Sequence, residues 1–102
     1  MIEAIDALNV LQETTNVLLD ALRKGDLAKA HEAVSVLLMQ GIDFYGLNHP
    51  VIQQCLPVWD AIKGHIDRGD TRRALEQTET WGHQLTEVIE LVRAGQPNAE
   101  LG

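Results

Sequence analysis

Apolar residues recur at steps of three and four positions in four segments of the chain, which is the spacing of one face of an α-helix. These segments predict helices over residues 2–23, 27–39, 50–67 and 71–94. Thr15 interrupts the first apolar stripe. A buried threonine is tolerated there because its hydroxyl can bond a backbone carbonyl one turn back. The pattern therefore predicts an all-α protein.

A Gly-Asp pair separates the first helix from the second and recurs between the third and the fourth, as Gly25-Asp26 and Gly69-Asp70. Glycine readily adopts the left-handed backbone conformation that ends a helix, and aspartate is a good N-cap for the next one. Connections this short make the two helices of each pair antiparallel. The sequence therefore predicts an antiparallel up-down four-helix bundle built from two helical hairpins.

The third helix has the weakest pattern of the four. Asn48 or His49 can cap it, and Pro50 fits in its first turn, where a missing N–H does no harm. Pro57 lies well inside it, removes a backbone donor and crowds the carbonyl of Gln53. We therefore expect the third helix to be kinked or broken near Pro57.

Residues 41–49 are the longest stretch without helical periodicity and hold the only Phe and the only Tyr of the chain. The first and fourth predicted helices are longer than the second, so this predicted loop lies beside their overhanging ends. It has two interpretations, because loops are usually polar. Either it folds back as a plug on the core, or it presents its apolar side chains to a partner.

Length and charge narrow the class of protein. At 102 residues we expect a single four-helix domain over residues 1–95, followed by a disordered C-terminal tail over 96–102. The formal net charge of −7 argues against a nucleic-acid surface and against binding to an anionic membrane. No apolar run approaches the ~18 residues that span a bilayer.

The single cysteine, Cys55, excludes a disulfide within the chain and favours a reducing compartment. The N-terminal segment carries Glu3 and Asp6 instead of the basic start of a signal peptide. We therefore expect an acidic cytoplasmic protein.

The chain contains no nucleophile elbow, phosphate-binding loop or zinc-ligand spacing, so we predict no catalytic residue, no metal site, no cofactor and no enzyme activity. Carboxylates flank His83 on the fourth helix and could bind a metal, but their positions lie opposite the apolar stripe and favour a solvated face. Basic residues near the Gly-Asp turns could bind an anion. We interpret them as charges that complement helix dipoles and pair with acids, as Arg72 can with Glu76.

The first functional hypothesis is a non-enzymatic protein–protein interaction module: a small adaptor, regulator or chaperone-like protein that forms a homodimer. It depends on the absence of catalytic motifs and on the aromatic loop over uneven helix ends. The candidate partner-binding residues are Phe44, Tyr45, Leu47, Trp59, Leu85 and Val88.

The alternative hypothesis is a helical bundle that binds a small molecule or a metal. Its pocket would lie near residues 41–59, where Pro57 opens the third helix. The candidate pocket residues are Tyr45, His49, Cys55 and Trp59.

Overall fold

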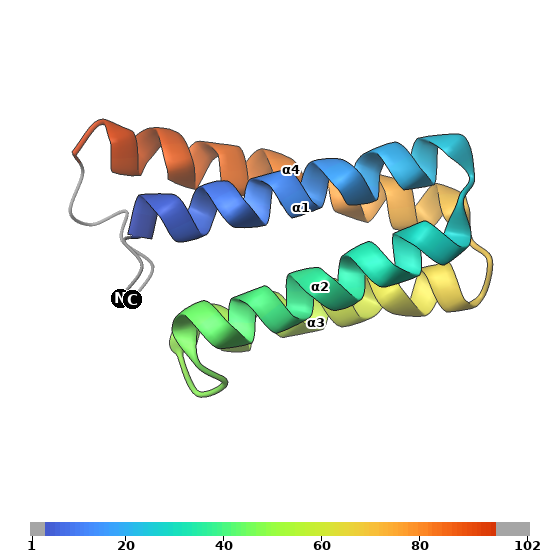
Figure 1. Cartoon of the computed structure of the whole chain (residues 1–102), viewed down its shortest axis with the longest axis horizontal. Helices are drawn as coiled ribbons and strands as arrows, with labels where there is room; N and C mark the ends of the chain where they lie inside the picture. The colour runs from blue at the N-terminus through green and yellow to red at the C-terminus, as the bar shows by residue number, and fades with distance from the viewer. Residues whose placement is uncertain (1–3, 96–102) are drawn as a thin grey trace.

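The structure, a computed structural model, describes residues 4–95 and contains four antiparallel helices (Figure 1). They are α1 (Ala4–Lys24), α2 (Leu27–Tyr45), α3 (Pro50–Asp67) and α4 (Thr71–Arg93). Helix α1 packs against α2 and α4, and α3 packs against the same two helices. This arrangement is the predicted up-down four-helix bundle. The predicted tail, residues 96–102, lies outside the described residues.

Both Gly-Asp turns have the predicted geometry. Gly25 and Gly69 have φ angles of 72° and 75°, in the left-handed region that favours glycine. The Asp26 carboxylate accepts a hydrogen bond from the backbone N–H of Lys29, and Asp70 accepts one from Arg73, each at 3.1 Å. The two turns lie at the same end of the bundle (Figure 1).

The predicted end of α2 near residue 39 is wrong, because the helix continues through Gly41 to Tyr45. Gly41 is buried inside the helix, and a Cβ atom there would lie 2.6 Å from ring atoms of Trp59. This glycine makes room for the Trp59 ring against the α2 backbone and does not end the helix. The irregular segment is therefore only residues 46–49, and the helix ends are less uneven than the sequence predicts.

Helix α3 runs without interruption from Pro50 to Asp67, so the predicted break near Pro57 is wrong and the predicted kink is not confirmed. Pro57 is exposed, as is Gln53, whose carbonyl loses its helical donor. A carbonyl on the solvent side can bond to water, which makes a proline tolerable there. His49 caps the helix through Nδ1, which accepts from the Val51 N–H at 3.1 Å.

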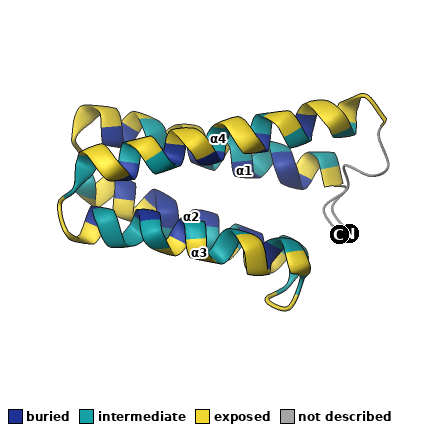
Figure 2. Cartoon of the chain, turned by 180° about the vertical axis from the view of Figure 1, so that it is seen from behind, coloured by how far each residue is buried: buried dark blue, intermediate teal, exposed yellow. Residues whose placement is uncertain are grey.

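The core has two halves of different composition, and buried residues line the inner sides of the helices in both (Figure 2). The half near the Gly-Asp turns is rich in small residues: Ala21, Ala30, Ala33 and Ala74. The other half contains both tryptophans, Trp59 and Trp81. The α1–α4 pair and the α2–α3 pair lie close together at the turns and farther apart at the other end (Figure 1). This taper follows the increase in side-chain volume along the core.

Candidate functional site

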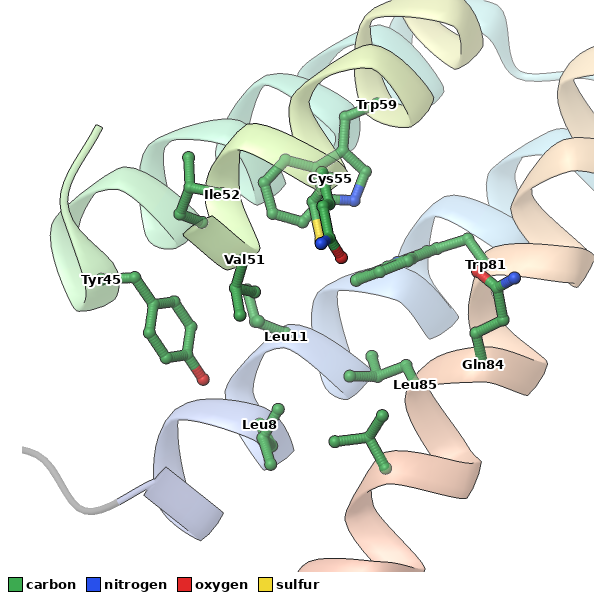
Figure 3. A pocket seen from close by; sticks show the side chains of 12 residues that line it. Leu8, Leu11, Tyr45, Val51, Ile52, Cys55, Trp59, Trp81, Gln84 and Leu85 are labelled. Atoms are coloured by element: carbon green, nitrogen blue, oxygen red, sulfur yellow. The ribbon is translucent and has the colours of Figure 1, made fainter. Parts of the chain in front are cut away.

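A cavity of about 160 Å³ lies between the two helix pairs, at the end that carries the α2–α3 loop (Figure 3). All four helices contribute to its wall, which is mainly aliphatic and aromatic. The lining side chains are Leu8, Leu11, Tyr45, Val51, Ile52, Gln54, Cys55, Trp59, Trp81, Gln84, Leu85 and Val88.

The two tryptophans stand next to each other in the cavity wall, one from α3 and one from α4 (Figure 3). Their ring centroids are 5.3 Å apart and their planes are perpendicular, at 89°. Such edge-to-face contacts are favourable for aromatic rings. Gly41 lets the Trp59 ring lie tightly against α2.

The two indole nitrogens differ in their hydrogen bonding. Trp81 Nε1–H donates to the Thr15 hydroxyl at 3.0 Å, and that hydroxyl donates to the Leu11 carbonyl at 2.8 Å, as predicted for Thr15. Trp59 is fully buried, at 0% exposure, and its Nε1–H has no hydrogen-bond partner among the described residues. Figure 3 shows this nitrogen on the side of the Trp59 ring that is turned toward Trp81 and the cavity.

Tyr45 closes one side of the cavity from the last turn of α2. Its hydroxyl is buried and has no hydrogen-bond partner among the described residues. Burial raises the pKa of the Tyr45 hydroxyl above its ordinary value, so the group stays a neutral donor at physiological pH. The side chain points from α2 toward the space between the helix pairs (Figure 3).

The Cys55 thiol also lines the cavity. Burial raises its pKa from the ordinary value of 9.0 to about 11, because the thiolate would lose hydration without gaining a cationic neighbour. The thiol is therefore neutral and weakly nucleophilic near pH 7. Its place in the wall makes it a reporter of cavity occupancy.

Among residues 4–95, no Lys, Arg, Asp or Glu lines the cavity wall. The polar side-chain groups that these residues place in the wall are the indole N–H groups of Trp59 and Trp81, the Tyr45 hydroxyl, the Cys55 thiol and the amides of Gln54 and Gln84. Both glutamines are exposed, so they lie where the cavity meets solvent between α3 and α4. The site can therefore hold a neutral, mostly apolar molecule and offers no buried countercharge to an ion.

Three of the four residues predicted for a ligand pocket, Tyr45, Cys55 and Trp59, line the cavity. His49 does not line it. Its ring lies 5.3 Å from that of Tyr45, and its Nδ1 caps α3.

The six candidate partner-binding residues do not form one exposed surface. Trp59 and Leu85 are buried, at 0% and 2% exposure, and Val88 lines the cavity. Phe44 is half-buried against the same core half, whereas Leu47 is 53% exposed. The structure thus brings four of the six together around the cavity: Tyr45, Trp59, Leu85 and Val88.

The sequence interpretation missed several other residues in the cavity wall. Leu8 and Leu11 had a clear apolar signal, and so did Trp81, but each reads equally well as ordinary core. The glutamines Gln54 and Gln84 carried no signal. The informative clue was Gly41, a glycine inside an apolar helical pattern, which is typical of a close approach by another group.

Two other candidate sites were predicted from charged residues: the basic residues near the Gly-Asp turns and the acidic face of α4. Arg72 lies 3.3 Å from Glu76, as predicted, and Lys24 lies 2.9 Å from Asp20. The hydrogen bond from Lys24 holds the pKa of the Asp20 carboxyl below its ordinary value. The acidic face of α4 is exposed, and residues 4–95 contain no cluster of three His, Cys, Asp or Glu that could hold a metal. No helix in that range is long and apolar enough to cross a membrane.

Comparisons with protein-family models, with curated proteins and with solved structures found no match for this chain. What the cavity binds is therefore inferred from its own side chains.

Proposed function

We propose that the protein is a non-enzymatic binding protein that takes up a small, mostly apolar molecule in the cavity between its helix pairs. The observation that carries the proposal is the cavity of about 160 Å³, whose apolar wall includes the unpartnered Trp59 N–H. Protein interiors are normally close-packed, and buried polar groups normally have partners. In this protein the cavity and the buried donor without a partner occur at the same place.

The size of the cavity supports a ligand of about one aromatic ring. A cavity of about 150 Å³ lined by aliphatic and aromatic side chains is known to bind benzene in another protein. The present cavity has a comparable volume and a similar wall, and it meets solvent beside Gln54 and Gln84. A cytoplasmic location, which suits the single thiol, remains part of the proposal.

The proposal is tested with cumene, a neutral one-ring hydrocarbon, and two reporters in the cavity wall. Trp59 and Trp81 are the only tryptophans of the chain, and Cys55 is its only cysteine. Cumene should change the intrinsic tryptophan fluorescence in a saturable way. It should also slow the alkylation of Cys55 by a maleimide, with the same midpoint concentration in both measurements.

The matched control moves the thiol away from the cavity. Cys55→Ser combined with Ser35→Cys places the single thiol at a partly exposed position on α2, outside the cavity wall. Cumene should leave its alkylation rate unchanged. An equal slowing in both proteins, or no saturable change in fluorescence, would contradict the proposal.

A second candidate function, self-association, is favoured by the outer face of α2. Val36, Met39 and Ile42 recur at steps of three along that face, and Met39 is 63% exposed. The inner face of the same helix is also apolar, so α2 is apolar on both sides. An exposed apolar stripe on a helix is a candidate interface, and a second copy of the chain would cover this one.

Light scattering at micromolar concentration tests this candidate. The wild-type protein should have the mass of a dimer, and Met39→Glu should have the mass of a monomer because it places a charge in the interface. Glu90→Gln, at an exposed position on α4, is the control and should stay dimeric. A wild-type monomer would rule out the homodimer.

A further inference from the structure

We infer that the ligand of the cavity is a neutral aromatic molecule that carries a hydrogen-bond acceptor, such as a carbonyl oxygen, which accepts from Trp59 Nε1–H once a shift of the Trp59 ring opens this buried nitrogen to the ligand. This inference rests on the proposed function and specifies the chemistry of its ligand. The Tyr45 hydroxyl is a second buried donor without a partner among the described residues, in another part of the same wall.

The chemistry of the indole N–H indicates that the ligand carries an acceptor. An indole nitrogen can only donate, so a buried indole N–H is satisfied by an acceptor or not at all. Trp81 has such an acceptor in Thr15, whereas Trp59 has none among the described residues. The ring of Trp81 is the neighbour on that side, and an aromatic ring is a weaker acceptor than an oxygen.

The charges of the cavity wall and of the whole chain indicate a neutral ligand. No cationic side chain of the described residues lines the cavity, so a carboxylate or phosphate would be buried there without a countercharge. The net charge of −7 also repels anions at longer range. A ligand cation would find no carboxylate of the described residues in the wall.

The aromatic rings in the cavity wall indicate an aromatic ligand. Trp59, Trp81 and Tyr45 present three ring systems to the same space (Figure 3). Aromatic rings pack well against each other in stacked or edge-to-face geometry, which favours an aromatic guest over an aliphatic one.

The test compares acetophenone with cumene by titration calorimetry. The two molecules have the same number of heavy atoms and nearly the same shape, but only acetophenone carries a carbonyl oxygen. In Trp59→Phe the affinity for acetophenone should fall about tenfold more than the affinity for cumene, because one hydrogen bond to a buried donor is lost. Acetophenone should also bind the wild-type protein at least as tightly as cumene.

Two further variants guard against a change in packing at Trp59. Tyr45→Phe keeps the ring and removes the other unpaired donor, and it should leave both affinities within twofold because the single carbonyl oxygen of acetophenone binds Trp59. Thr14→Val removes a hydroxyl that donates to Gln40 outside the cavity, and it should change neither affinity.

The outcomes separate the two proposals. If Trp59→Phe changes both affinities by the same factor, or if cumene binds the wild type tenfold tighter than acetophenone, the acceptor chemistry is wrong while the apolar cavity still binds. If neither compound binds the wild-type protein, the proposed function itself fails.

Discussion

Single residues in this bundle are best understood in contrasting pairs. Trp81 and Trp59 have the same side chain and line the same cavity, yet among residues 4–95 only Trp81 has an acceptor for its N–H. Thr15 supplies that acceptor and stays satisfied because its own hydroxyl donates to Leu11. Leaving a buried donor unpaired costs about 1–3 kcal/mol. Trp59 therefore carries a cost that a suitable ligand would remove.

Two helical glycines make a second contrasting pair and a prediction. Gly41→Ala should lower the free energy of unfolding by about 1–2 kcal/mol, because its Cβ would lie 2.6 Å from the Trp59 ring. Gly82→Ala should raise it by up to about 1 kcal/mol, because its Cβ would lie 3.7 Å from Thr15 Cγ2, an ordinary contact. Urea denaturation of both variants checks this. Stabilisation by Gly41→Ala would contradict the packing described for Trp59.

The thiol of Cys55 predicts a dependence of stability on pH. Its pKa is raised from 9.0 to about 11 in the folded protein, so the unfolded chain releases this proton first as the pH rises. The stability that the neutral thiol contributes is complete below about pH 9 and is lost between pH 9 and pH 11.

Denaturation of the wild type and of Cys55→Ala at pH 8, 9.5 and 11 isolates this contribution. The unfolding free energy of the wild type should fall relative to that of the variant across the series. Other groups that titrate in this range are common to both proteins, and the difference also contains the coupling of Tyr45 to Cys55, whose charge raises the Tyr45 pKa. A constant difference would mean that the thiol is solvated in the folded state.

At the scale of elements, local chemistry determined what the sequence could predict. The start of α3 and both Gly-Asp turns depend on caps and backbone preferences that are encoded within a few residues, and the structure confirms them. The end of α2 depends on Trp59, which lies far along the chain and lets the helix continue through Gly41. Such tertiary contacts override a local stop signal.

Helix α3 supplies the prediction at this scale. Pro57→Ala should raise the free energy of unfolding by about 1–2 kcal/mol, because it restores a donor for the Gln53 carbonyl and removes the steric conflict with it. Part of the gain is offset because proline also restricts the unfolded chain. Urea denaturation measures the change, with Asp60→Ala as a control on the same exposed side. A loss of stability would mean that the helix is built around the proline.

At the scale of the whole molecule, the bundle is tapered, with alanines at the turn end and tryptophans at the loop end. The sequence could predict the four helices and their antiparallel order, because both follow from periodicity and short turns. It could also point to residues 41–59 as the region of interest. It could not separate core from cavity, because Leu8, Trp81 and Leu85 have the same apolar signal in either role.

The most direct test of the ligand-binding cavity is the nuclear magnetic resonance signal of the two indole N–H groups in ¹⁵N-labelled protein. Trp59 and Trp81 give one Nε1–H resonance each, which Trp59→Phe assigns. On titration with acetophenone, the Trp59 resonance should move downfield as its proton gains an acceptor. The Trp81 resonance should move less, because its bond to Thr15 is already formed. Two resonances that stay unchanged at saturating acetophenone would contradict the account.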